Sequence, residues 1–311
     1  MEQFELHESP LTQFELNFEQ LLYNRPAFLN SNNDWPKRHF YLFDKKEEKY
    51  RAHVVFNIND KVAVSPLKAP FGGIEFDLSL GQSSLEFFLN EVEAALHREG
   101  VEELRIHQPP ENYLPQEQVN NAFEASGYEM IQERIYQGID IDEIPLSEKI
   151  HEMQRRRLKK CEQEPFTFKK YSKGELPKVY NQINRYRYKA GKGLSMKWVD
   201  LHDSSVRNPS VYKAFGIENE NGLIIAGTIT VSVNAKVLYN FFPASYDAYN
   251  KYSPMVMLLD KVYDWAAANG YRHIDLGTSY VHKDLNTSLR DFKERMGGKE
   301  FSAKSWRKKL N

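Results

Sequence analysis

The residues best placed for ligand chemistry precede an expected helix in the second half of the chain, at residues 255–266. Ser253 can cap the first turn of this helix, and Pro254 suits the first helical position because its missing N–H costs nothing there. No acidic residue follows within the next turn, so the remaining amides and the positive helix end are open to an anion, with Lys251 just in front. The alternative is an ordinary capped helix that packs on a sheet.

Two basic segments could also contact phosphate groups. Residues 155–160 carry five cations on an expected helix at 146–164, although such a run is also typical of a solvated helix face. Residues 185–189 alternate Arg or Lys with Tyr, a pattern that could stack on and pair with a nucleotide. The same tyrosines could equally pack inward, so both interpretations stay open.

Several kinds of chemistry lose support because their motifs are missing. The sequence contains no Gly-x-Ser-x-Gly, His-Glu-x-x-His, Walker or Gly-x-Gly-x-x-Gly motif, which disfavours hydrolases, zinc peptidases, NTPases and dinucleotide-binding enzymes. The nine histidines are scattered, and Cys161 is the single cysteine. We therefore expect no metal site and no intramolecular disulfide.

A helix and a strand recur at one constant spacing and indicate an internal duplication. The later helix has an apolar stripe, ends at Gly270 and leads into a strand at 271–276. The earlier copy has a matching stripe, ends at Gly100 and leads into a strand at 104–107. The two stripes align without a gap: Leu85, Phe88, Leu89, Val92 and Leu96 match Met255, Leu258, Leu259, Val262 and Ala266. The match predicts two copies of one fold.

The two helix entrances differ in the sequence. Ser83 is followed by Glu86, the spacing of a capping box in which a helix satisfies its own first amides. The later entrance has no such carboxylate. We therefore expect the second copy to bind an anionic ligand and the first copy to have a different role.

Composition sets the remaining bounds. The 311 residues fit two domains, which we place at 1–145 and 146–311, and 41% hydrophobic with 27% charged residues is typical of a globular protein. A net charge of -1 gives no overall attraction to DNA or to a membrane. The acidic N-terminus is unlike a signal peptide, and no apolar run reaches membrane-spanning length. We expect a cytoplasmic protein.

Each half of the chain is predicted to contain three antiparallel strands, a helix, a strand, a helix and a strand. This order resembles the GNAT acyltransferase fold, and the second half is similar to the acetyltransferase domain of the FemAB and CelD-like branch. The resemblance is carried by Tyr252-Ser253-Pro254, residues 270–277, Phe292-Lys293 and Met296-Gly297-Gly298. It covers residues 147–308, and the first half only by architecture. The expected class is α+β: two tandem GNAT-like domains, each a mixed, mostly antiparallel sheet flanked by helices.

The resemblance implies transfer of an acyl group from acyl-CoA, for example acetyl-CoA, to an amine, without a metal. In this fold the helix N-terminus receives the donor pyrophosphate, which agrees with the open entrance described above. The implied donor-binding residues are Lys251, Tyr252, Ser253 and Pro254 at the entrance, with Tyr239, Asn240 and Phe241 on the strand that borders the acyl group. A backbone amide on that strand could hold the oxyanion. The first domain would instead form a wall of the acceptor cleft.

The same resemblance suggests where an acid or a base could act. Asp275, Tyr280 and His282 lie at or after the end of the opposing strand, although Asp275 could also be a structural cap on the neighbouring loop. Acceptor contacts are expected from Arg187, Tyr246, Tyr249 and Ser279. The acceptor would be a small molecule or a precursor of peptidoglycan or of a polysaccharide.

Three functions remain after the sequence has been considered. The first is an N-acyltransferase that uses acyl-CoA. The second is FemAB-type transfer of an aminoacyl group from tRNA to a cell-wall precursor; enzymes of that type usually carry a long helical hairpin in the second domain, for which the span between Tyr171 and Val211 is too short. The third is a non-catalytic member that binds a sugar or a nucleotide-containing ligand.

Overall fold

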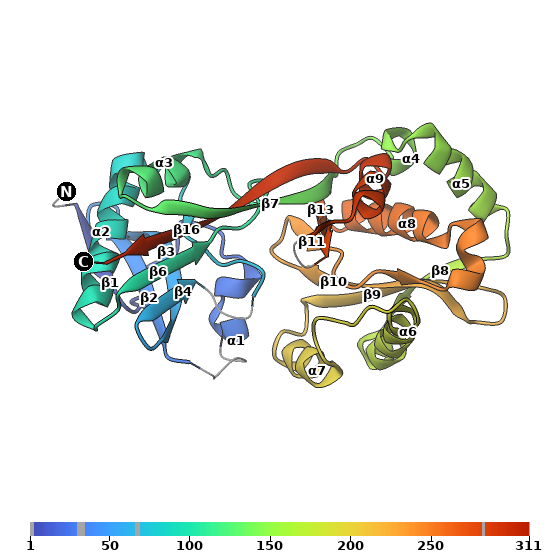
Figure 1. Cartoon of the computed structure of the whole chain (residues 1–311), viewed down its shortest axis with the longest axis horizontal. Coiled ribbons are helices and arrows are strands. Elements are labelled where there is room, and N and C mark those ends of the chain that lie inside the picture. The colour runs from blue at the N-terminus through green and yellow to red at the C-terminus, as the bar shows by residue number, and fades with distance from the viewer. Residues whose placement is uncertain (1–2, 30–34, 66–68, 282–283, 311) are drawn as a thin grey trace. The chain divides into compact units, whose positions relative to one another are not determined.

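The computed structural model describes residues 3–29, 35–65, 69–281 and 284–310, and the chain divides into two units (Figure 1). The first unit contains residues 1–135 and 301–311, and the second contains residues 136–300. The division differs from the predicted boundary after residue 145, because the boundaries between the two units fall within two strands, β7 and β16. Residues 136–140 of β7 (Glu129–Asp140) pair with a strand of the second unit, and residues 305–309 of β16 (Lys299–Lys309) pair with a strand of the first.

The first unit is a mixed sheet with a long antiparallel part. Its other strands are β1 (Phe4–His7), β2 (Lys37–Asp44), β3 (Lys49–Asn59), β4 (Val62–Ser65), β5 (Glu75–Phe76) and β6 (Glu103–His107). The order is β1-β2-β3-β4-β6-β16-β7, with β5 added beside β3. Within it, β4 and β6 run parallel. Parallel neighbours need a crossover, and the helix that lies between them in the chain supplies it.

The helices of the first unit are η1 (Leu22–Asn24), α1 (Pro26–Leu29), α2 (Gln82–Arg98) and α3 (Glu117–Ala125). All five stripe residues predicted for α2 are buried, and they join the main core with α3, with one face of the sheet and with Trp306 of β16. The opposite face carries a smaller aromatic cluster, Tyr41, Phe43 and Tyr50, against which Phe14, Leu16 and Phe18 pack.

The second unit repeats this plan. Its strands are β8 (Thr167–Tyr171), β9 (Tyr212–Glu218), β10 (Ile224–Ser232), β11 (Val237–Tyr239), β12 (Ala244–Ser245), β13 (His273–Thr278), and the hairpin of β14 (Tyr280–Val281) and β15 (Asp284–Leu285). The order is β7-β13-β11-β10-β9-β8, with β12 beside β10. As in the first unit, the parallel pair, β11 and β13, lies next to an antiparallel meander.

The helices of the second unit cover both faces of its sheet. They are α4 (Leu146–Lys149), α5 (Glu152–Glu162), η2 (Lys173–Glu175), α6 (Leu176–Lys189), α7 (Trp198–Arg207), η3 (Asp247–Tyr252), α8 (Pro254–Ala268) and α9 (Thr287–Arg295). Figure 1 shows α8 and α6 on opposite sides of β9 and β10. Four of the five stripe residues of α8 are buried and Met255 packs against them, as the spacing predicts.

The register of the strands confirms that equivalent positions recur. Val62 pairs with Glu103 in the first unit, and Val237 pairs with His273 in the second. Positions in β2 and β4 are therefore related by an offset of 175 residues, positions in β3 by 174, and positions from α2 to α3 by 170. The offset changes by five because residues 66–74 join β4 to β5, whereas residues 240–243 suffice between β11 and β12.

Two local predictions about helices are wrong. The helix expected at 146–164 is divided, because Ile150 is extended and His151 begins α5 by accepting the N–H of Met153 at its Nδ1. The capping box at Ser83 and Glu86 does not form. Helix α2 starts after Gly81, two residues earlier than the box requires, so Glu86 lies inside the helix and accepts a hydrogen bond from Gln82 instead.

Among the residues that the structure describes, no helix is both long and apolar enough to cross a membrane. Nor do three His, Cys, Asp or Glu side chains of the described ranges come together in a group that could hold a metal ion.

Candidate functional site

The entrance to α8 is formed by η3 and a strained residue. Ser253 adopts a left-handed conformation, with φ 58°, and Pro254 occupies the first helical position as predicted. The predicted cap is wrong, because in this conformation the Ser253 side chain makes no cap hydrogen bond to the described backbone of α8. Lys251 is exposed here, and Lys160 of α5 donates to its carbonyl oxygen over 3.4 Å. The N-terminus of α8 is thus accompanied by two ammonium groups and suits an anion.

The parallel strands β11 and β13 stop pairing after a short distance. Their last register pair is Tyr239 with Asp275, and the N–H of Asn240 still donates to Asp275 O over 2.8 Å. The next two amides, of Phe241 and Phe242, turn to Ile229 O of β10 instead. Because these three N–H groups already have acceptors, the oxyanion role expected for a backbone amide of this strand is not available to them here.

A buried polar group lies where the two strands part. Asp275 is 3% exposed, and its Oδ1 accepts the N–H of Gly277 over 2.5 Å. Gly277 has φ +71°, a left-handed value that glycine adopts without cost, and a Cβ on it would lie 3.2 Å from the Tyr239 ring. Asp275 therefore does cap the neighbouring loop, and this turn brings the loop against Tyr239.

Lys293 of α9 completes this group and was missed as a site residue in the sequence. Its side chain is 5% exposed, and Nζ donates to the carbonyl oxygens of Gly277 and Thr278 over 2.7 and 2.8 Å. Burial lowers its pKa to about 8, while the nearby Asp275 opposes that shift. The only signal in the sequence was its place in Phe292-Lys293, three residues before Met296-Gly297-Gly298.

Tyr239 is the third titratable group at this point. Burial raises the pKa of its phenol well above the ordinary value, and the charge of Asp275 adds to the shift. Arg187 of α6 acts in the opposite direction, which places its guanidinium within electrostatic reach of Tyr239. The structure thus associates Arg187, predicted for the acceptor, with Tyr239, predicted for the donor.

Other predicted residues are used for structure. The side chain of Asn240 accepts a hydrogen bond from Thr228 over 2.6 Å. Ser279 is buried and donates to Gln137 Oε1 over 2.9 Å, and Gln137 in turn donates to Arg290 O. Tyr280 is 36% exposed at the start of the β14–β15 hairpin. His282 lies outside the described residues.

The remaining predicted aromatic residues form a series that leads to the α8 entrance. Tyr246 stacks on Tyr186 of α6, with ring centroids 5.1 Å apart, and packs beside Tyr249 at 5.8 Å. Tyr249 lies 6.1 Å from Tyr252, the residue before the left-handed Ser253. Lys189 lies over the Tyr246 ring. Of the two tyrosines in residues 185–189, Tyr186 packs inward and Tyr188 is exposed.

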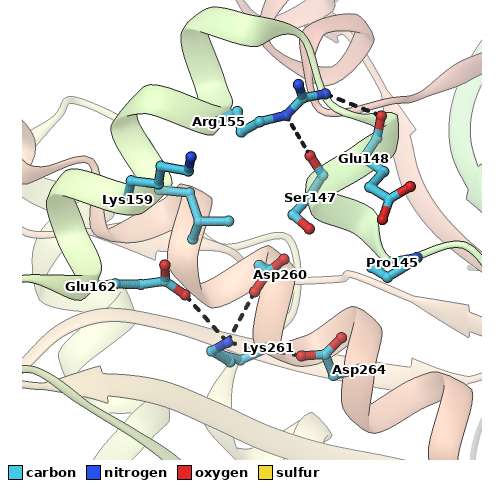
Figure 2. Close-up of a pocket in the computed structure, with 10 residues that line it drawn as sticks. Pro145, Ser147, Glu148, Arg155, Lys159, Glu162, Asp260, Lys261 and Asp264 are labelled. Carbon is cyan, nitrogen blue, oxygen red and sulfur yellow. Dashed lines mark hydrogen bonds and ion pairs between the residues drawn. The ribbon is translucent and has the colours of Figure 1, made fainter.

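A separate pocket of about 590 Å³ lies between α4, α5 and α8 (Figure 2). Arg155 faces it but is held by the carbonyl oxygens of Ser147 and Glu148, at 2.8 and 3.3 Å. Lys261 on the other side lies near three carboxylates, those of Glu162, Asp260 and Asp264. Because carboxylates line this pocket and Arg155 is already bonded, it does not favour a phosphate. From the basic run, Lys160 is the residue bonded at the α8 entrance.

Comparison with known proteins agrees with the architecture. Residues 153–293 match the family model described as the acetyltransferase (GNAT) domain. The chain is similar to the crystal structure of FemX, with a TM-score of 0.78 and 12% identity, over 99% of this chain and 98% of that one. No curated protein matches the sequence.

Two further structures share the fold at lower scores. The structure of L-PGS from Bacillus licheniformis gives a TM-score of 0.58 at 15% identity, over 87% of this chain and 83% of that one. A tandem GNAT protein from the clavulanic acid biosynthesis pathway gives 0.50 at 8% identity, over 89% and 84%. The predicted α+β class is therefore confirmed, as is the GNAT fold, and the findings support the GNAT superfamily for residues 153–293.

Proposed function

We propose that this protein is an N-acyltransferase whose second unit binds an acyl-CoA donor, such as acetyl-CoA. The observation that carries the proposal is the separation of β11 and β13 after Tyr239 and Asp275, within a segment that matches the GNAT domain. A thioester placed where two strands part can be approached by an amine without displacing a strand. The α8 entrance, with Lys251 and Lys160, would receive the donor phosphates.

The polar group at the separation can supply the proton transfers. The acceptor amine attacks the thioester carbon, the carbon–sulfur bond breaks, and the amine proton must leave while the thiolate is released. The Asp275 carboxylate is the candidate for receiving the amine proton. Tyr239 keeps its proton because its pKa is raised, so its phenol is available to the leaving thiolate. Tyr280 and His282 remain further candidates for an acid or base.

The acceptor is proposed to lie along the aromatic series of Tyr246 and Tyr249, near Arg187. Flat aromatic faces bind the apolar face of a sugar or a nucleotide, and Arg187 suits a carboxylate or a phosphate. These features favour an acceptor from cell-envelope or polysaccharide metabolism that carries both a sugar and an anionic group.

The test combines binding and turnover. Calorimetric titration with acetyl-CoA should show saturable binding, and release of free thiol should require both acetyl-CoA and an amine from a panel of amino sugars and short peptides. Desulfo-CoA, which cannot carry an acyl group, is the control that separates binding from transfer. A folded protein that neither binds acetyl-CoA nor releases thiol with any amine would refute the proposal.

A second candidate is FemAB-type aminoacyl transfer to a cell-wall precursor. It is favoured by the similarity to FemX, which extends over nearly the whole of both chains. Against it, α6 and α7 occupy the region between β8 and β9 where such enzymes usually carry a long helical hairpin. Transfer of a radiolabelled amino acid from charged tRNA to a nucleotide-linked peptide, without dependence on acetyl-CoA, would favour this candidate over the first.

A further inference from the structure

A chain of three ionisable side chains crosses one face of the sheet in the first unit. His53 of β3 is fully buried, and Glu75 of β5, its register partner, is 1% exposed. His53 Nδ1 lies 3.4 Å from Glu75 Oε2, and His53 Nε2 lies 3.3 Å from Nδ1 of His39 on β2. Both separations are within hydrogen-bond reach, so the three groups are linked in series.

The inner end of the chain is fixed and the outer end is open. The other oxygen of Glu75 accepts the N–H of Leu21 over 2.6 Å. Tyr41 stacks on the His53 ring at 4.4 Å and holds its plane. His39 is half-buried, and within the described ranges its Nε2 has no hydrogen-bond partner. A proton can therefore enter or leave this chain at His39.

We propose that Glu75, His53 and His39 form a proton relay, and that Nε2 of His39 is a general base for a ligand that presents a hydroxyl or an ammonium group on this face of the first unit. With Glu75 ionised, each imidazole carries its hydrogen on Nδ1, and Nε2 of His39 has a free lone pair. When that nitrogen takes a proton from the ligand, the Nδ1 proton of His39 passes to His53 Nε2, and the Nδ1 proton of His53 passes to Glu75. One proton has moved from the ligand to Glu75, and both imidazoles have changed tautomer.

The surroundings keep the imidazoles neutral and the proton at the carboxyl group. Burial lowers the pKa of His39 to about 4 and that of His53 to about 3, and it raises the pKa of Glu75 to about 8. The charged neighbours are Lys37 of β2, which faces His39, and Arg25 and Glu19 of the N-terminal segment, which face Glu75. Tyr41 and Tyr50 are the other titratable groups of the cluster, and the pKa of Tyr41 is raised to about 12. A base of this kind suits the deprotonation of amines. The fraction of the relay that can accept a proton rises as the pH approaches 8.

The second unit has no equivalent chain. Ala214 and Gly227 occupy the positions of His39 and His53, and Ala244 occupies that of Glu75. The relay is therefore not a requirement of the fold, whose sheet is built without it in the second copy. Burying a carboxyl group and two imidazoles costs free energy, and this cost calls for a use in the first unit alone.

The test uses the full chain and a reagent that reacts with the free lone pair on Nε2 of His39. Diethyl pyrocarbonate acylates an unprotonated imidazole nitrogen, and mass spectrometry of peptides assigns the product. The modification rate of His39, divided by that of the exposed His202, should rise about tenfold between pH 7 and pH 9 as Glu75 ionises. In Glu75→Gln the amide donates to His53 at every pH, so His39 should stay unreactive across this range.

A second measurement keeps the proposal testable if the variant does not fold. In the parent protein, ¹⁵N chemical shifts should show the His39 hydrogen on Nε2 at pH 6.5 and on Nδ1 above pH 9. Identical pH profiles of modification in the parent and in Glu75→Gln would overturn the relay. A His39 tautomer that stays constant between these pH values would overturn it as well.

Discussion

The two units place very different side chains at equivalent positions around their parallel strand pairs. The second unit has Tyr239, Asp275 and Lys293 where the first has Val64, Arg105 and Phe123. Phe123 is fully buried and stacks on Trp306 with ring centroids 5.2 Å apart, whereas Lys293 bonds two carbonyl oxygens. Of the three first-unit residues, Phe123 belongs to the apolar core, whereas Val64 is half-buried and Arg105 is exposed. The second copy instead carries a polar group at these positions.

In the first unit, residues 71–74 lie beside the end of the parallel strand pair. Residues 71–74 are buried, and the N–H of Gly72 donates to His107 O over 3.0 Å. The N–H of Ile74 donates to Gln108 Oε1 over 3.1 Å. In the second unit the carbonyl equivalent to that of His107, on Gly277, is bonded by Lys293. We therefore expect the five extra residues between β4 and β5, and not the capping box that does not form, to keep a donor out of the first unit.

The largest effect is expected from removing the charge that distinguishes the second unit. Lys293→Met leaves two carbonyl oxygens without their buried donor and releases the turn against Tyr239 and Asp275. Turnover, measured as thiol release, should fall about 100- to 1000-fold. In the parent, activity should decline above pH 8, because Lys293 then loses the proton that strengthens both hydrogen bonds. The variant should lack this inflection.

The matched control is Phe123→Met, the same replacement at the equivalent position of the first unit. It should reduce the free energy of unfolding by about 1 kcal/mol or more, as core changes do, and leave turnover per folded molecule unchanged. Equal losses of turnover in both variants would show that Lys293 acts only through stability.

A smaller effect is expected from the turn at Gly277. In Gly277→Ala the new Cβ would lie 3.2 Å from the Tyr239 ring, so the ring must move. In Gly270→Ala the glycine has a similar φ, +82°, but no described neighbour lies within 4 Å of the added carbon. Both variants should lose about 1–2 kcal/mol of stability from the left-handed backbone. Turnover should fall about 10- to 100-fold further in Gly277→Ala alone, because only that change displaces a side chain of the site. Similar turnover in the two variants would show that the position of the Tyr239 ring does not affect the reaction.

The sequence was sufficient to predict the parts of the fold that recur in both units. It was not sufficient to predict where the two units differ. Apolar spacing predicted α2 and α8 because burial of one helix face leaves a regular pattern. It could not show that β7 and β16 pair where they do, since strand partners are chosen by contacts far apart in the chain. The capping box failed because Ser83 and Glu86 have the right spacing, but the helix starts at a different residue. The sequence did not point to Lys293 as a candidate site residue because a lysine on an amphipathic helix normally faces solvent.

A modest effect is expected at the α8 entrance. Lys251→Glu replaces an exposed cation with an anion near the helix N-terminus and should weaken acetyl-CoA binding about three- to tenfold, with a smaller difference at high salt. Lys236→Glu makes the same change on the exposed turn before β11 and should bind the donor as the parent does. Calorimetry at two salt concentrations compares the pair. Equal weakening in both variants would indicate a general effect of net charge and not a phosphate site on α8.

The smallest effect is expected at the N-terminus of α2. A substitution there distinguishes two explanations for the binding of only one donor per chain. If a capping box closed α2, Glu86→Ala would cost about 0.5–2 kcal/mol and free amides for a second donor. In the structure Glu86 only accepts a hydrogen bond from Gln82 within the helix, so the free energy of unfolding should change by less than about 0.5 kcal/mol. Calorimetry should give one acetyl-CoA per chain before and after the substitution, because residues 71–74 still lie beside the end of the parallel strand pair of the first unit. A second site of similar affinity in the parent would show that this loop does not exclude the donor, and the difference between the two units would then lie only in their polar residues.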